Sequence, residues 1–191
     1  MTIELHTWNT PNGRKISVAL EEMGLPYKVF PVNITKGEQM APSFLAISPN
    51  NKIPAIVDPE GPEAKRVSIF ESGAILLYLG EKTGKFLPKP LAQRIPVYEW
   101  LMWQMGGFGP MPGQVHHFIA LENEQDRAYG LKRSWPRRAA STACSIGGLR
   151  AGSSSPVRCR LPTSRFWDGP GGIRATRWSS PISPTSNAGT R

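Results

Sequence analysis

Residues 50–84, NNKIPAIVDPEGPEAKRVSIFESGAILLYLGEKTG, combine two short apolar runs with a change to helical spacing. Two short apolar runs, 54–58 and 66–70, are joined by a polar turn, which predicts an antiparallel hairpin of two strands. Residues 71–84 then change to the apolar spacing of a helix. The segment therefore predicts strand, strand and helix in that order.

Residues 1–49 add three more elements and a short helix before this segment. Alternating residues in 2–8 predict a half-buried strand, and a helix with Asn12 as its N-cap is predicted after it. The apolar residues on one face of this helix are Ile16, Ala19, Leu20 and Met23. A second strand is predicted in 27–34, parallel to the first, and a short helix in 41–48. The order βαβ, α, ββα predicts an α/β domain with a small mixed sheet and helices on both faces.

The next part of the chain is predicted to be helical. A linker over 84–96 leads to helical patterns in 97–107 and 118–133. We therefore predict an α/β domain over 1–85, followed by the linker and the start of an all-helical domain over 86–133.

Residues 134–191 differ from the rest in charge and composition. Of the formal net charge of +9, residues 1–133 contribute +1 and residues 134–191 contribute +8. Ser, Arg, Gly and Pro make up 33 of these last 58 residues, which leaves too little apolar surface to offset the chain entropy of folding. We expect a mostly disordered, irregular tail. Because its arginines are scattered and form no recognition motif, nucleic-acid binding is not expected.

Cysteine, histidine and hydropathy patterns exclude several kinds of site. Cys144 and Cys159 both lie in the tail, and they do not have the spacing of metal ligands. The adjacent His116 and His117 are interpreted as packing residues or second-site contacts. The N-terminus lacks the features of a secretory signal, and no stretch is long enough for a membrane span. The sequence predicts a cytoplasmic protein with no metal and no membrane partner.

Four motifs follow one another before residue 134. They are TPNGRKI at 10–16, KGEQMAPSFLAISPNNKIPAIVD at 36–58, FESGAILLYLGEKTG at 70–84 and WLMWQMGGFGPMPGQVHHF at 100–118. Together they resemble the glutathione transferase family, and in particular its bacterial Nu class of disulfide reductases. The resemblance implies a thioredoxin-like domain followed by an all-helical one, a homodimer, and glutathione as the cosubstrate for disulfide reduction. Conjugation of glutathione to small electrophiles is the alternative reaction, and a non-catalytic domain of the same fold is the other alternative.

The resemblance also implies which residues bind glutathione. Pro54 is a cis proline in the family, which exposes the backbone of Ile53 to the cysteinyl part of glutathione. Gln39 and Lys52 match positions that contact the glycyl end or the backbone, and Arg133 matches a position near the carboxylates. Without the resemblance, Pro54 would be a trans proline at a strand start, and Gln39 and Lys52 would be solvated surface.

Glu71 and Ser72 open the last helix of the α/β domain. Free N–H groups and the helix dipole favour a carboxylate at this place. The γ-glutamyl end of glutathione carries an ammonium and a carboxylate, so it could use Glu71 for one and Ser72 with the helix N-terminus for the other. Such a pair is otherwise more often a simple helix cap.

Thr10 and Asn12 lie where many glutathione transferases place a reactive Tyr, Ser or Cys. Neither is a competent general base, but both can donate hydrogen bonds that favour a bound thiolate over a thiol. Because residues 1–133 contain no cysteine, the reactive sulfur is expected to come from glutathione, whose thiolate attacks a disulfide by exchange. The alternative is that these residues serve only as turn and cap.

The resemblance ends at Arg133, although the family has further helices after this position. The residues after Arg133 can be written as GC-rich codons and translated again from one nucleotide earlier. This neighbouring frame encodes a helix, a turn and a capped helix in the order found in the family. We hypothesise that one nucleotide was lost at codon 134, in the gene or in its sequencing. The incomplete helical domain would leave Trp100, Leu101 and Trp103 under-covered, and this chain is expected to fold poorly or to have low activity.

Overall fold

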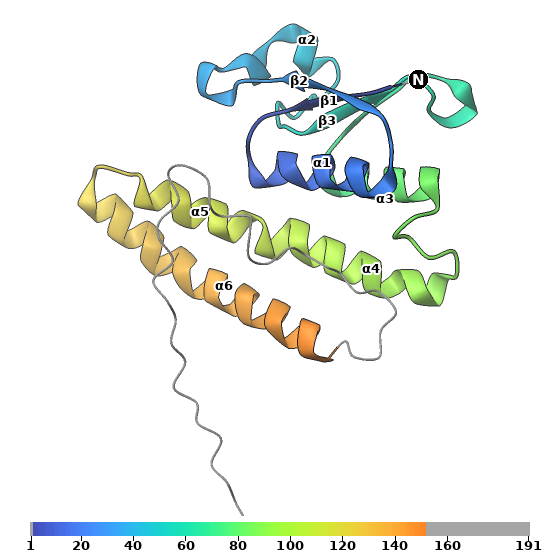
Figure 1. Cartoon of the computed structure of the whole chain (residues 1–191). Helices are drawn as coiled ribbons and strands as arrows, with labels where there is room; N and C mark the ends of the chain where they lie inside the picture. Colours follow the sequence, from blue (N-terminus) through green and yellow to red (C-terminus); the bar gives the residue numbers. More distant parts are fainter. Residues whose placement is uncertain (1, 152–191) are drawn as a thin grey trace, which may run out of the picture. The chain divides into compact units, whose positions relative to one another are not determined.

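The first part of the chain forms a four-stranded mixed sheet (Figure 1). The structure is a computed structural model and describes residues 2–151. The strands are β1 (Ile3–Thr7), β2 (Tyr27–Pro31), β3 (Ala55–Asp58) and β4 (Val67–Phe70), in the spatial order β2-β1-β3-β4. β1 and β2 are parallel, and the β1–β3 and β3–β4 pairs are antiparallel. The predicted parallel pair and hairpin are therefore confirmed.

Helices cover both faces of this sheet, as predicted. α1 (Pro11–Met23) and α3 (Ser72–Thr83) pack on one face, with α2 (Pro42–Leu45) on the other. The first core comprises Ile3, Leu5, Ile16, Ala19, Leu20, Met23, Ile56, Ile75 and Leu79. Phe44 of α2 packs with Val32 and Ala55 in the second core. β3 is buried along its whole length because it contributes to both. The remaining short helices are η1 (Ile34–Lys36), η2 (Glu38–Met40) and η3 (Pro62–Ala64).

The N-cap of α1 is Thr10, so the prediction of Asn12 was wrong. Thr10 has extended backbone angles, and its Oγ1 accepts a hydrogen bond from the backbone N–H of Gly13 at 3.2 Å. Pro11 occupies the first helical position, where a missing N–H costs nothing and the fixed φ suits a helix. Asn12 is therefore already inside the helix.

Four helical segments follow the sheet. They are α4 (Leu91–Trp103), the π-helix η4 (Gln104–Phe108), α5 (Pro110–Ile119) and α6 (Glu124–Ala151). α4 begins inside the predicted linker and contains Pro96, so the linker is shorter than expected. Two prolines near its start made this segment resemble a linker in the sequence.

This helical region has little core among the described residues. α4 has no buried residue, and Val115 of α5 is the only buried hydrophobic side chain described after Leu87. Trp100 is 41% exposed, while Leu101 and Trp103 are half-buried. The expected under-covering therefore holds for Trp100, whereas Leu101 and Trp103 are partly covered.

α6 does not end at Arg133, which corrects the expectation of an irregular segment directly after this residue. The helix continues to Ala151, although Pro136 lies within it and removes one backbone hydrogen-bond donor. Alanines at 139, 140 and 143 favour the helix locally, an effect that the overall composition did not reveal. The rest of the predicted tail, 152–191, lies outside the described residues.

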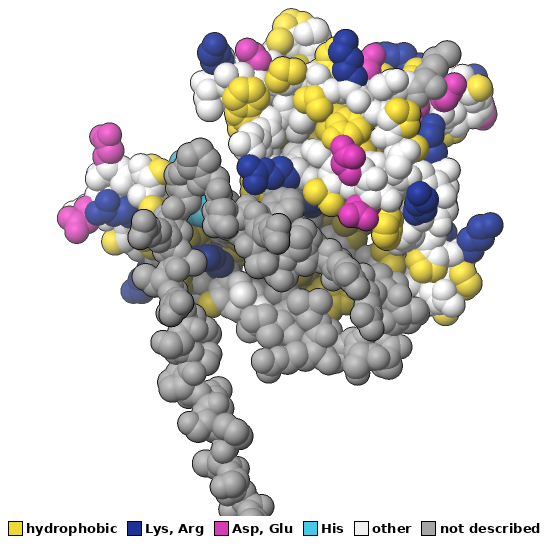
Figure 2. All heavy atoms as spheres, viewed as in Figure 1, with side chains coloured by type: hydrophobic (Ala, Val, Ile, Leu, Met, Phe, Trp, Pro, Cys, Tyr) yellow, Lys and Arg dark blue, Asp and Glu magenta, His cyan; other side chains and the backbone are white. Residues whose placement is uncertain are grey.

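Charged side chains are interspersed on the face of the molecule in Figure 2. Lys and Arg alternate with Asp and Glu over the region of the sheet and its helices, with no continuous basic surface there. This distribution agrees with the small net charge of residues 1–133. Within residues 2–151, every helix is too short or too polar to span a lipid bilayer.

Candidate glutathione site

Thr10 and Asn12 lie together at the N-terminus of α1. The Thr10 oxygen accepts the Gly13 N–H, which leaves its own hydroxyl hydrogen available to donate to a ligand. Asn12 is exposed near the same end of the helix. Both side chains can therefore supply hydrogen-bond donors beside the positive end of the α1 dipole.

Glu71 and Ser72 form the N-terminus of α3, as predicted. Glu71 has φ 69° and ψ 115°, a strained backbone for a residue with a side chain, which costs on the order of 1–3 kcal/mol and is typical of ligand sites. Its carboxylate accepts a hydrogen bond from Asn50 Nδ2 at 3.3 Å. Ser72 is only 3% exposed. A carboxylate and a buried hydroxyl therefore adjoin the free N–H groups of a helix end.

The segment before β3 has the expected backbone. The Ile53–Pro54 peptide bond is cis, which confirms the prediction. Ser48 Oγ donates a hydrogen bond at 2.8 Å to the carbonyl of Lys52, which fixes the residue just before Ile53. Pro54 itself is buried, whereas Ile53 is half-buried.

Gln39 lies in η2 with an unused acceptor. Its Oε1 atom is buried and has no hydrogen-bond partner in the described part of the chain. A buried acceptor without a donor costs about 1–3 kcal/mol, so a donor from a ligand would stabilise this position. The amide N–H groups of a peptide such as glutathione are donors of this kind.

Lys52 and Arg133 line one cavity of about 800 Å³. The other lining residues are Pro110, Gly113, Gln114, His117, Phe118 and Ser134. Its volume lies within the range of about 300–1,000 Å³ that is usual for small-molecule sites. Two cationic side chains favour an anionic ligand here. His117 was interpreted only as a packing or second-site residue, and the structure places it in this cavity.

Lys15 is not among the predicted site residues, yet its charge interacts with the carboxylate of Glu71 in the candidate site. Its Nζ atom donates a hydrogen bond at 2.7 Å to Gln104 Oε1 in η4. Burial lowers the pKa of Lys15 to about 8, and the carboxylate of Glu71 partly opposes this change. Its place in the TPNGRKI motif was the only signal in the sequence that could have identified it.

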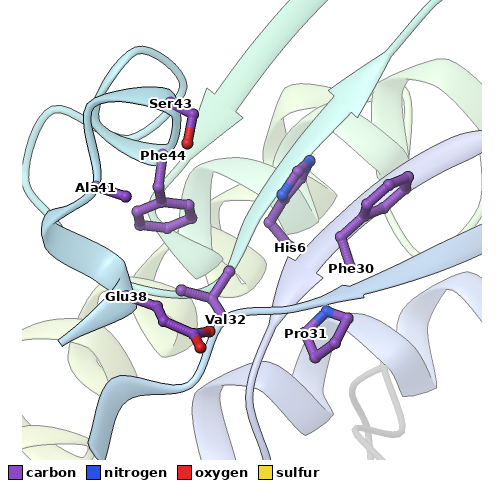
Figure 3. A pocket seen from close by; sticks show the side chains of 8 residues that line it. All are labelled: His6, Phe30, Pro31, Val32, Glu38, Ala41, Ser43 and Phe44. Atoms are coloured by element: carbon purple, nitrogen blue, oxygen red, sulfur yellow. The ribbon is translucent and has the colours of Figure 1, made fainter. Parts of the chain in front are cut away.

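A second, smaller pocket lies on the α2 side of the sheet and contains none of the predicted site residues. His6 of β1 stacks on Phe30 of β2 with a ring-centroid distance of 5.0 Å, and Phe44 of α2 lies across from them (Figure 3). The pocket has a volume of about 280 Å³. Residues 2–151 also contain no group of three or more His, Cys, Asp or Glu side chains placed to hold a metal ion.

Comparisons with known proteins show the family to which this fold belongs. Residues 10–82 match the N-terminal domain of glutathione S-transferases. A glutathione transferase homolog from Lodderomyces elongisporus, solved with two glutathione molecules per subunit, superimposes with a TM-score of 0.71 at 31% identity. The match covers 80% of this chain and 73% of that chain. The chain belongs to the glutathione transferase family.

Two other glutathione transferase relatives are more similar in sequence. The disulfide-bond oxidoreductase YfcG of Escherichia coli is 55% identical over 117 residues, which cover 61% of this chain and 54% of YfcG. A family member from Pseudomonas fluorescens, solved with two glutathione molecules bound, is 45% identical with a TM-score of 0.74, over 78% of this chain and 66% of that chain. The chain thus spans about half the length of YfcG.

Proposed function

We propose that this glutathione transferase is a glutathione-dependent thiol–disulfide oxidoreductase. The observation that carries the proposal is the chemistry at the N-terminus of α1, where Thr10 and Asn12 offer hydrogen-bond donors but no thiol. The first cysteine of the chain is Cys144. Because residues 1–133 contain no cysteine, we infer that the ligand brings the nucleophilic sulfur, and the activity of YfcG given by its name supports the same reaction.

The residues have distinct roles in this proposal. Glu71, Ser72 and the N-terminus of α3 bind the γ-glutamyl end, and the backbone of Ile53 pairs with the cysteinyl part. Gln39 and Lys52 hold the glycyl end or backbone. Thr10 and Asn12 donate to the sulfur, which lowers the pKa of the bound thiol because they favour its thiolate.

The reaction consumes two glutathione molecules for each disulfide. The first thiolate attacks one sulfur of the disulfide, forms a mixed disulfide with it and releases the other half as a thiol. A second glutathione then attacks the mixed disulfide, and the products are glutathione disulfide and the second thiol. The cavity beside Lys52 and Arg133 is large enough for a small ligand next to the first glutathione, and its two cations suit the carboxylates of a second one.

Replacing Thr10 with Ala tests this role. We expect turnover of a small disulfide with glutathione to fall about 10- to 100-fold, because a donor to the thiolate is lost. The free energy of unfolding should fall by about 1 kcal/mol through loss of the N-cap. The pKa of the bound thiol, followed by thiolate absorbance, should rise. Thr10→Ser is the matched control and should retain all three properties.

A different outcome would assign Thr10 to the helix alone. If Thr10→Ala lost stability but retained turnover and the pKa of the bound thiol, the side chain would be only a cap. Asn12→Ala separates the two effects further, because Asn12 is not the N-cap and should affect turnover without the same loss of stability. If neither Thr10→Ala nor Asn12→Ala changed the turnover, a non-catalytic domain would be the better description.

We also propose that the protein is a cytoplasmic homodimer. Leu91, Ile95 and Met102 are exposed apolar residues on α4, spaced to lie on one side of the helix, and a homodimer would cover them. Sedimentation would detect this dimer through its mass. We place the enzyme in the cytoplasm, because the reaction needs reduced glutathione and that compartment keeps thiols reduced.

A further inference from the structure

Met105 of η4 lies against the N-terminus of α3. Ser72 Oγ donates a hydrogen bond to Met105 Sδ at 3.5 Å. A Cβ atom placed on Gly73 would be only 3.0 Å from Met105 Cγ and 3.2 Å from Sδ. The methionine side chain therefore rests on the first two residues of α3, at the helix end proposed for the γ-glutamyl group.

Lys15 of α1 reaches the same sulfur atom. Its Nζ is 3.6 Å from Met105 Sδ, in addition to its 2.7 Å hydrogen bond to Gln104 Oε1. A single thioether thus accepts from both an ammonium and a hydroxyl. Thioether sulfur is a weak acceptor, whereas a carboxylate forms charge-assisted hydrogen bonds that are about twice as strong as neutral ones.

The charge of Lys15 is poorly compensated by its protein contacts. Its hydrogen-bond acceptors, Gln104 and Met105, are both neutral. The lowering of its pKa to about 8 reflects this burial, which the carboxylate of Glu71 only partly offsets. A ligand carboxylate near Nζ would supply the missing negative charge.

We propose that Lys15 is a further binding residue for the α-carboxylate at the γ-glutamyl end of glutathione, and that this carboxylate displaces the Met105 sulfur from Lys15 and Ser72. The inference rests on the proposed glutathione function. In the structure, the Met105 thioether accepts the hydrogen bonds of Lys15 Nζ and Ser72 Oγ that the ligand carboxylate would accept instead. The position of Met105 in a π-helix, followed by Gly106 with open space around it, gives this segment room to adjust.

The test uses two ligands that differ only in the carboxylate. The first is S-methylglutathione, whose sulfur does not titrate, and the second has a γ-aminobutyryl group in place of the γ-glutamyl group. Calorimetry gives Kd for both with the unmodified chain, Lys15→Met and Lys15→Arg. Lys15→Met retains the aliphatic stem without the charge, and Lys15→Arg retains the charge.

Loss of the ligand carboxylate should weaken binding to the unmodified chain about 30-fold, in line with a charge-assisted contact. In Lys15→Met the same loss should cost only about 3-fold, because the cationic partner is already absent. Lys15→Arg should behave like the unmodified chain. Equal weakening of both ligands by Lys15→Met would overturn the proposal, since Lys15 would then act only on the structure.

The pH dependence supplies a readout that a structural role would not change. A bound carboxylate raises the pKa of Lys15, so binding favours the protonated amine and the advantage is lost as pH rises through the higher, bound-state pKa. The extra affinity of the unmodified chain over Lys15→Met should therefore shrink above about pH 8. Among the groups around Lys15, the carboxylate of Glu71 on α3 is the charge that acts on its pKa. The neighbouring Arg14 on α1 is hydrogen-bonded to Asn9. The two hydrogen-bond acceptors of Lys15, Gln104 and Met105 of η4, do not titrate. The ligand amine titrates in the same way with the unmodified chain and with Lys15→Met, so its effect cancels when the two affinities are compared.

Displacement of Met105 can be observed without any Lys15 variant. With ¹³C-methyl methionine, the Met105 signal, assigned through Met105→Leu, should shift on binding S-methylglutathione and stay in place with the ligand that lacks the carboxylate. An unchanged signal with S-methylglutathione would overturn the displacement. If the unmodified chain bound neither ligand, the proposed glutathione function would fail. If it bound both equally, only the inference about Lys15 would fail.

Discussion

Gly13→Ala is expected to destabilise the protein by about 3 kcal/mol, the upper end of the usual cost of overpacking. A Cβ atom on Gly13 would lie 2.5 Å from the carbonyl oxygen of Trp8 and still closer to Thr7 Oγ1. Trp8 contributes backbone here, so a rotamer change cannot relieve the contact. α1 would have to move away from the end of β1, and with it the donors of Thr10 and Asn12.

Urea unfolding measures this effect, and Gly106→Ala is its control. No heavy atom lies within 4 Å of the corresponding Cβ position at Gly106. The control should therefore change the free energy of unfolding by less than about 1 kcal/mol, the scale of helix propensity. If Gly13→Ala were as stable as the unmodified chain, the close approach of α1 to β1 would be incorrect.

Asp58→Ala is expected to cost about 3 kcal/mol, because it removes a buried carboxylate that pairs with the partly exposed Lys82. Asp58 is 1% exposed, and its Oδ2 accepts hydrogen bonds from Tyr78 Oη and Lys82 Nζ, each at 2.6 Å. Its Oδ1 accepts from the backbone N–H of Glu60 at 2.9 Å. These contacts join the end of β3 to α3, so the variant removes the acceptor of the Tyr78 phenol and leaves the Lys82 ammonium only the carbonyl oxygen of Glu60, at 2.6 Å.

An exposed ion pair provides the comparison for this prediction. Glu63 and Lys65 form a salt bridge at 2.7 Å with both side chains 77% exposed. Glu63→Ala should change the free energy of unfolding by less than about 1 kcal/mol, because water screens the pair. Equal effects of the two variants would show that the Asp58 network contributes nothing beyond a surface contact.

The same network makes the stability depend on pH. Burial alone would raise the pKa of Asp58, but hydrogen bonds from Lys82, Tyr78 and the Glu60 backbone outweigh it and hold that pKa below the usual value. The stabilisation is therefore complete above the ordinary carboxyl pKa of about 4 and is lost as pH falls through the lower pKa of the folded state. The stability difference between the unmodified chain and Asp58→Asn should shrink over that acidic range. A difference that stays constant down to pH 2 would contradict this account.

Periodicity in the sequence was sufficient for the α/β domain because each core strand and helix has its own local pattern. Ile16, Ala19, Leu20 and Met23 have helical spacing, and all four are buried. The start of α4 was missed because Pro90 and Pro96 resemble a linker, although α4 begins directly after the first and tolerates the second near its start.

The sequence predicted the site residues that belong to a local motif. It missed those that only tertiary packing brings to the site. Glu71 and Ser72 follow from a helix start, but nothing local indicates that Lys15 meets Met105. A lysine on an amphipathic helix normally remains in water, whereas Lys15 is half-buried and contacts Gln104 and Met105 of η4. Lys52 and His117 likewise share a cavity although they are far apart in the sequence.

The lost nucleotide at codon 134 stays a prediction. Resequencing the gene would decide the matter. A neighbouring reading frame closed by stop codons, or one that encodes no helices, would contradict the hypothesis.

In the proposed reaction glutathione, and not the protein, supplies the reactive sulfur. Cys144 and Cys159 are the only cysteines in the chain, so Cys144→Ser combined with Cys159→Ser removes every protein thiol. The direct measurement is the glutathione-dependent reduction of a small disulfide, above the uncatalysed exchange, by this double variant and by the unmodified chain. Equal rates above background are the predicted result, even if both rates are low. Turnover that disappears in the double variant, or that is absent from both proteins, would contradict the account.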